Sequence, residues 1–299
     1  MFASDHRAQP AMKARNFRYI RPLSLDHAYR ILSDNEGDAV PLAGGQSLLA
    51  TLNMRLSAPK LLVDISELKE LAGESLAAGC LRLGALTLHR ELLGSKLVKK
   101  HVPLLARAAS HIGHVAIRNR GTLGGSLAYA DPAAELPACA VALGAKIELG
   151  SRKGARSVQA EDFFKGLFET DLRPGELILS VNFPVMQNRN AMGFAELARR
   201  HGDFALVGLA AVATMRNERI AQARIVYFGC VDRARLAQSV SAAVEGLTTP
   251  VPNAAAFESA IRSDLAPDET PGLRADTKLH VAAVLTRRVL NSLSGSAAA

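Results

Sequence analysis

Two glycine pairs stand in segments whose residue types suit the binding of an anion. The first segment is PLAGGQSLL, from Pro41 to Leu49, and the second is RNRGTLGGSLAYADPAAE, from Arg118 to Glu135. Because glycine has no Cβ, its backbone N–H groups can approach a ligand closely. A serine follows each pair within two residues and adds a hydroxyl donor. A turn of this kind between a strand and a helix is typical of anion sites, so two of them predict a cradle for a diphosphate.

The pattern alone leaves a second interpretation open, in which both segments are ordinary tight turns. Neither matches the nucleotide-binding patterns G-x-x-x-x-G-K-[ST] and G-x-G-x-x-G. If the cradle interpretation holds, its donors come from residues 44–47 and 122–126, among them the hydroxyls of Ser47, Thr122 and Ser126.

Two acidic residues follow the second glycine pair. Asp131 precedes Pro132, a pairing that predicts a helix beginning there with Asp131 as its N-cap. Contact between Asp131 and a ligand is the alternative. Glu135 falls in the first turn of this predicted helix, where it either favours the helix dipole or contacts a ligand. Pro137 predicts a kink or an early end of that helix.

The charge and aromatic content argue against a nucleic-acid-binding protein. The formal net charge is +8, but the basic residues are scattered rather than clustered. The chain has no tryptophan and only 5% aromatic residues, so it is poor in stacking platforms for bases. The basic balance therefore indicates a solvated surface or the docking of an acidic partner protein.

The cysteine and apolar patterns indicate a soluble, cytoplasmic protein without a metal centre of its own. Cys80, Cys139 and Cys230 lie far apart, which argues against disulfides, iron–sulfur clusters and zinc sites within the chain. His111 and His114 are three residues apart and lack a third ligand. The longest nearly apolar stretch, 204–215, is too short to cross a hydrocarbon layer of ~30 Å, so no membrane span is expected.

The length and the order of predicted elements indicate more than one domain. With 299 residues the chain exceeds the usual size of a single core. Strands and helices alternate in the first part of the chain, which predicts a small α/β unit. We predict an extension over 1–14, subdomains over 15–66 and 67–186, and a C-terminal domain over 187–299.

Three motifs together resemble a known family. PLAGGQSLL, IRNRGTLGGSLAYADPAAELPA and ARRHGDFALVG occur in this order, at distances that resemble the FAD-binding medium subunit of the xanthine dehydrogenase and carbon monoxide dehydrogenase (molybdenum hydroxylase) family. The resemblance extends from about residue 17 to residue 293. It implies an α+β fold: a PCMH-type (vanillyl-alcohol-oxidase-like) FAD-binding domain of two α/β subdomains, followed by a domain with a small antiparallel sheet and a helical bundle.

The resemblance also implies which residues bind FAD. Both glycine loops would surround the diphosphate, and Tyr129, Asp131 and Glu135 would contact the adenosine or ribityl part. Leu179 would lie near the adenine or flavin ring, and Arg200 would lie on the segment that passes the ring together with Arg199 and Asp203. The implied loop residues are Ala43, Gly44, Gly45, Gln46, Ser47 and Leu48 in the first, and Thr122, Leu123, Gly124, Gly125 and Ser126 in the second.

As a member of this family the chain would be an oxidoreductase subunit without catalytic residues for the organic substrate. A large molybdopterin-binding subunit would oxidise the substrate, and a small subunit with two [2Fe–2S] clusters would carry electrons to FAD. An external acceptor would then take them, and two trimers would form a heterohexamer. The alternative is a stand-alone FAD-dependent oxidase or reductase with the same type of FAD domain, which requires a substrate pocket of its own.

Overall fold

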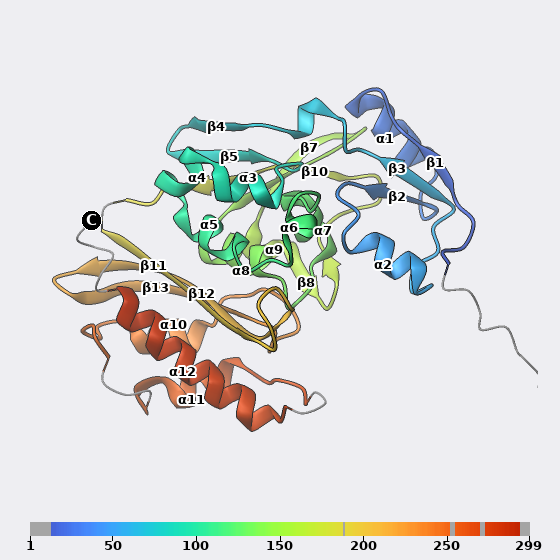
Figure 1. Cartoon of the computed structure of the whole chain (residues 1–299). Helices are drawn as coiled ribbons and strands as arrows, with labels where there is room; N and C mark the ends of the chain where they lie inside the picture. The colour runs from blue at the N-terminus through green and yellow to red at the C-terminus, as the bar shows by residue number, and fades with distance from the viewer. Residues whose placement is uncertain (1–12, 188, 252–254, 270–272, 294–299) are drawn as a thin grey trace, which may run out of the picture.

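The structure, a computed structural model, describes residues 13–187, 189–251, 255–269 and 273–293. The predicted extension over 1–14 lies almost entirely outside these residues. The described chain contains three larger sheets, each covered by helices (Figure 1). The predicted domain boundaries at 66/67 and 186/187 stay predictions.

A small parallel sheet forms the N-terminal part, with strand order β1-β3-β2. Parallel neighbours need crossover connections, and the two helices between the strands provide them. Ser24 caps the first helix, because its hydroxyl accepts a hydrogen bond from the backbone N–H of His27 at 3.2 Å. The elements are β1 (Arg18–Ile20), α1 (Leu25–Asp34), β2 (Ala39–Leu42), α2 (Leu48–Asn53) and β3 (Leu61–Asp64).

The second part is built on a five-stranded antiparallel sheet with strand order β4-β5-β10-β6-β7. Its strands are β4 (Glu74–Ala77), β5 (Cys80–Gly84), β6 (Lys146–Ser151), β7 (Gly154–Gln159) and β10 (Leu177–Pro184), with a separate pair β8 (Phe164–Gly166) and β9 (Glu169–Thr170). Its helices are η1 (Lys69–Leu71), α3 (His89–Gly94), α4 (Lys96–His101), α5 (Pro103–Ala109), α6 (Val115–Arg118), α7 (Leu123–Tyr129), α8 (Glu135–Ala142) and α9 (Ala160–Phe163).

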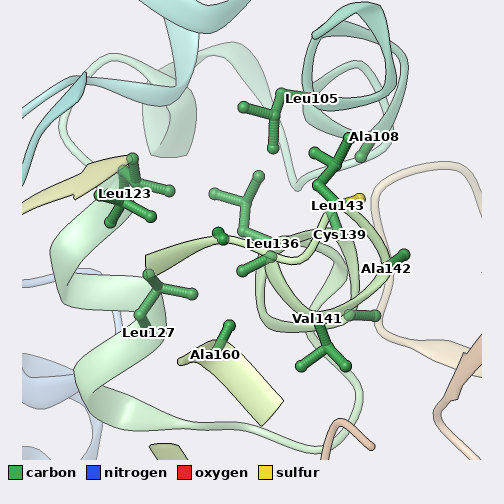
Figure 2. Close-up of a cluster of buried hydrophobic side chains, with 14 of the residues drawn as sticks. Leu105, Ala108, Leu123, Leu127, Leu136, Cys139, Val141, Ala142, Leu143 and Ala160 are labelled. Carbon is green, nitrogen blue, oxygen red and sulfur yellow. The ribbon is translucent and has the colours of Figure 1, made fainter. Parts of the chain in front are cut away.

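Helix α8 lies at the centre of this part, and every one of its residues is buried. Its neighbours in the core come from α5 and α7: side chains such as Leu105, Leu123 and Leu127 converge with Leu136 of α8 (Figure 2). The core therefore fixes α7, which carries the second glycine pair, and the start of α8 that follows it.

The start of α8 corrects one sequence prediction. The helix begins at Glu135, not at Pro132, and Asp131 is not its N-cap. The Asp131 carboxylate instead accepts a hydrogen bond from the backbone N–H of Ala133 at 2.9 Å and so closes a turn before the helix. The predicted kink at Pro137 is also absent, because this residue lies in the first helical turn, where a missing N–H breaks no helical bond.

The C-terminal part is a three-stranded antiparallel sheet, β11 (Asn190–Ala198), β12 (Ala205–Arg216) and β13 (Arg219–Phe228). Helices α10 (Gln238–Val244), α11 (Ala255–Asp264) and α12 (Ala275–Leu293) lie below it in Figure 1, and α8 packs against β12 and β13. A buried hydrogen bond of 2.6 Å between the hydroxyls of Tyr227 and Thr286 ties α12 to the sheet. Among the described helices, none has the length and apolar character needed to span a bilayer.

Candidate functional site

One large cavity lies between the N-terminal sheet and the five-stranded unit. Its volume is about 780 Å³, within the range of small-molecule sites. Both glycine segments line it, the first with residues 43–48 and the second with residues 121, 122 and 124–126. The turn between β11 and β12 reaches it with residues 202–204, so segments from all three parts of the chain meet here.

The first glycine loop offers free hydrogen-bond donors to the cavity. Gly45 has a φ of +71°, a conformation that favours glycine. Among the hydrogen bonds of the described residues, none takes up the backbone N–H of Gly45, Gln46 or Ser47. The Gln46 side-chain amide donates to the Gly44 carbonyl at 2.9 Å and so closes the loop on itself. Three consecutive unpaired N–H groups at a cavity wall form a concave anion site.

The second glycine loop uses its donors inside the protein. The backbone N–H groups of residues 123–126 all bond within the chain, so the loop presents few free N–H groups to a ligand. The bonds run from Leu123 to the Thr87 carbonyl at 2.8 Å, from Gly124 to the Ala85 carbonyl at 2.8 Å, from Gly125 to the Thr122 hydroxyl at 3.1 Å and from Ser126 to the Thr122 carbonyl at 3.0 Å.

Close packing explains why glycine is required at position 44 in the first loop and at position 124 in the second. A Cβ on Gly44 would overlap the carbonyl oxygen of Arg120, so the first loop rests directly on the backbone that leads into the second. A Cβ on Gly124 would lie 2.6 Å from the Cβ of Ala85. The two loops are thus in backbone contact, and any side chain at Gly44 would separate them.

A buried histidine supports the second loop from behind. The Nε2 atom of His89 lies 3.1 Å from the Thr122 carbonyl oxygen. Burial lowers the pKa of His89 to about 4, with the nearby Arg118 acting in the same direction against the bond to Thr122. His89 is therefore neutral near pH 7, and Nε2 carries the proton that it donates to the carbonyl.

Three predicted residues form a partly buried polar corner of the cavity. Tyr129, Asp131 and Glu135 all line it, and the Tyr129 ring lies edge-on to Phe168 with centroids 5.2 Å apart. Burial raises the pKa of Tyr129 and of Asp131 above their usual values, and it raises the pKa of Glu135 to about 8. Arg173 is the one lysine or arginine among the described lining residues, so the cavity is rich in acids and poor in cations.

A loop that the sequence did not suggest forms another wall. Residues 172–178 line the cavity, and Arg156 holds them in place. Its guanidinium donates to Asp171 at 2.6 Å and to Glu176 at 2.7 Å. The hydrogen bond from Arg156 lowers the pKa of Asp171, which keeps this carboxylate charged and paired.

Three of the predicted site residues do not line the cavity. Leu123 is fully buried in the core beneath it, Leu179 packs partly buried beside Gly150 and Tyr29, and Arg200 is exposed in the turn after β11. Its neighbour Asp203 does line the cavity. The remaining predicted residues all do so: Ala43, Gly44, Gly45, Gln46, Ser47, Leu48, Thr122, Gly124, Gly125, Ser126, Tyr129, Asp131 and Glu135. Direct contact of each with FAD stays a prediction.

Sequence reasoning missed His89 and the walls formed by residues 172–178 and by Ile112 and Gly113. The histidine stands in GALTLHRELL, without a companion residue that signals a ligand. The two histidines of the HIGH segment at 111–114 have a spacing that suggests a metal site, but it is Ile112 and Gly113 of this segment that line the cavity. Among the described residues no cluster of histidine, cysteine and acidic side chains forms a metal site.

Two family profiles match the chain. The family described as "FAD binding domain in molybdopterin dehydrogenase" matches residues 15–186, and "CO dehydrogenase flavoprotein C-terminal domain" matches residues 193–293. Together they cover nearly all of the described residues.

Known proteins agree with these profiles. The 6-hydroxypseudooxynicotine dehydrogenase complex subunit alpha of Paenarthrobacter nicotinovorans is 42% identical over 73% of this chain and 74% of its own length. The carbon monoxide dehydrogenase medium chain of Afipia carboxidovorans is 31% identical over 92% of this chain and 96% of its own. A chain of quinoline 2-oxidoreductase from Pseudomonas putida 86 superposes with a TM-score of 0.90 at 39% identity, over 95% of this chain and 99% of that chain.

Proposed function

The chain belongs to the FAD-binding medium subunits of the molybdenum hydroxylase family, and from this premise we propose how its cavity holds FAD and where its electrons come from. The observation that carries the proposal is the row of unpaired backbone N–H groups at Gly45, Gln46 and Ser47, which faces a cavity of about 780 Å³.

The diphosphate of FAD lies on the first glycine loop. Its negative charge needs several donors, and the lining offers backbone N–H groups rather than cationic side chains. The second loop adds the hydroxyls of Thr122 and Ser126 to the lining, and the backbone that precedes it packs directly against the first loop. Tyr129, Asp131 and Glu135 extend the site toward the turn of residues 202–204.

When bound, FAD supplies the redox chemistry, and the protein supplies position and surroundings. The buried helix α8 and the neutral His89 hold the second loop rigid, and Arg156 holds the wall of residues 172–178. The hydrophobic residues Ile112, Ile117 and Phe204 also line the cavity.

The chain works as one subunit of an electron-transferring complex. The relatives are named as a complex subunit and as a medium chain rather than as complete enzymes. We propose that this chain receives electrons from the [2Fe–2S] clusters of a small partner subunit and passes them to an external acceptor, while a large molybdopterin-binding subunit oxidises the organic substrate. A heterohexamer of two such trimers is the assembly we propose.

The first test is the identity of the bound compound. The purified chain is expected to show the two absorption bands of a flavin and to release FAD in equimolar amount on heating. If the purified chain is colourless, it is mixed with FAD alone and, separately, with FAD plus the two partner subunits. Uptake only with the partners would show that the site is completed in the complex, and failure in both mixtures would contradict the proposal.

A further inference from the structure

Glu135 is a buried acid without a cationic partner. Only 7% of its surface is exposed, and that part faces the cavity. Within the described chain no lysine, arginine or histidine forms an ion pair with it. A buried carboxylate without a partner is costly, and such groups usually bind a proton instead.

The charge of a second acid, Glu196 on β11, adds to the effect of burial and raises the pKa of Glu135 further. The side chain of Glu196 is 4% exposed, and its Oε1 atom lies 3.1 Å from Nδ1 of His111. Its other oxygen, Oε2, is buried and has no hydrogen-bond partner. The His111 ring is itself held between Phe194 and His201, with centroids 5.0 and 5.7 Å away.

The two acids therefore form an unequal pair. Negative charges on both would repel each other in a site shielded from water, so the pair retains a proton. A contact of 3.1 Å joins Glu196 to the His111 ring, whereas the Glu135 carboxyl accepts a hydrogen bond from its own backbone N–H, which lowers its pKa less than burial raises it. The other titratable groups that act on Glu135 are Asp131 and Cys139, and neither brings a positive charge.

Resting on the FAD position proposed above, we propose that Glu135 enters the site as a protonated acid that donates a hydrogen bond to an acceptor atom of FAD, and that Glu196 and His111 are positioning residues that keep the proton on Glu135. A neutral donor at this place avoids repulsion between a carboxylate and the anionic cofactor in a cavity already rich in acids. The raised pKa of Glu135, about 8, agrees with this state near neutral pH.

The protonation state can be measured without any cofactor. Infrared spectra of the cofactor-free full chain are recorded from pH 6 to pH 10 and compared with those of Glu135→Gln and Glu196→Gln. The wild type is expected to show a carboxylic-acid carbonyl band at pH 7 that disappears with a midpoint near pH 8. This band is absent in Glu135→Gln, and in Glu196→Gln its midpoint moves to lower pH, because a repelling charge has been removed.

FAD affinity as a function of pH gives the second readout, from quenching of flavin fluorescence. Wild-type affinity is expected to fall by up to about tenfold per pH unit above the midpoint. Glu135→Gln removes this fall, and Glu196→Gln and His111→Gln move its onset to lower pH. The matched control is His114→Gln, an exposed histidine in the same segment, which keeps the wild-type profile.

Each part of the inference has an outcome that overturns it. The absence of the carbonyl band at pH 7, or its persistence in Glu135→Gln, overturns the protonated acid. An unchanged midpoint in Glu196→Gln overturns the positioning role. If the band behaves as expected but neither the wild type nor any variant binds FAD at any pH, with or without the partner subunits, the proposed FAD position fails while the proton assignment stands.

Discussion

The two glycine loops of this protein share residue types but differ in what they do with them. In the first loop the backbone N–H groups of Gly45, Gln46 and Ser47 are free, and the loop is shaped by its own side-chain bond from Gln46. In the second loop the N–H groups of residues 123–126 are all bonded within the chain. Gly45 in the first loop therefore leaves its N–H free for a ligand, whereas Gly44 in the first loop and Gly124 in the second permit close packing.

Because of this difference, we expect the first loop to contribute chiefly to ligand affinity and the second chiefly to folding. A loop with free donors gains its partners only when an anion binds, so its sequence matters chiefly to affinity. A loop whose donors are already bonded is part of the core, so its sequence matters chiefly to folding. The two loops meet where Gly44 rests on the Arg120 carbonyl, and there affinity and folding depend on the same contact.

The largest effect is expected from Gly44→Ala, because the new methyl group would overlap the backbone carbonyl of Arg120, which cannot rotate away. The loops must move apart, at a cost of about 1–3 kcal/mol in the free energy of unfolding. Since the cavity wall is displaced as well, FAD affinity should fall by about a hundredfold or more, which is about 3 kcal/mol. Urea unfolding and fluorescence titration with FAD measure the two quantities.

Gly94→Ala serves as the control for this substitution. Nothing lies within 4 Å of a Cβ at Gly94, which ends helix α3 on the surface. This variant should bind FAD like the wild type and be equally stable or slightly more stable. Equal FAD affinity in Gly44→Ala and Gly94→Ala would show that the loops do not need their backbone contact.

The second-largest effect is expected from Gly124→Ala, in which the loss of stability should outweigh the loss of FAD affinity. Its methyl group would lie 2.6 Å from the Ala85 Cβ, in a region where α7 packs on the core. We expect the cofactor-free protein to lose about 1–3 kcal/mol of stability, with a smaller loss of FAD affinity than in Gly44→Ala. A variant with normal stability that fails to bind FAD would show that the second loop is a binding loop after all.

The sequence could predict the position of both loops but not this division of work. Local signals sufficed for the glycine turns, because turn residues act over short distances. Ala85 and Thr87, whose carbonyls bond to the second loop, lie far from it in the sequence. Gly44 and Arg120, which are in contact, are also far apart in the sequence. Such contacts depend on tertiary packing, which no local pattern encodes. The start of α8 differs from the prediction for another reason: Asp131 has the chemistry of a helix cap, but its carboxylate closes a separate local turn with Ala133.

A third effect, on the second loop, depends on pH and arises from His89. Its pKa is about 4 in the folded protein and near 6.5 in the unfolded chain, so the unfolded chain binds the proton first on acidification. Stability should therefore fall as the pH is lowered from about 6.5 to 4, by at most about 1.4 kcal/mol per pH unit.

Replacing His89 with glutamine should remove this part of the acid sensitivity. Glutamine keeps a donor for the Thr122 carbonyl but does not titrate in this range. Unfolding free energies of the cofactor-free protein at several pH values measure the difference, with the exposed His114→Gln as the matched control. Equal acid sensitivity in the two variants would mean that His89 is not held neutral behind the second loop.

The smallest effect concerns the shape of the first loop. Gln46→Ala removes the 2.9 Å hydrogen bond to the Gly44 carbonyl but leaves the backbone donors of the loop in place. An exposed hydrogen bond of this kind contributes about 0.5–1.5 kcal/mol, so FAD affinity should fall between twofold and about tenfold. Stability of the cofactor-free protein should barely change, because the first loop, unlike the second, is not part of the core. The control Gln222→Ala, an exposed amide on β13, should change neither quantity. A loss of stability without a loss of affinity in Gln46→Ala would give the first loop the role that the structure assigns to the second.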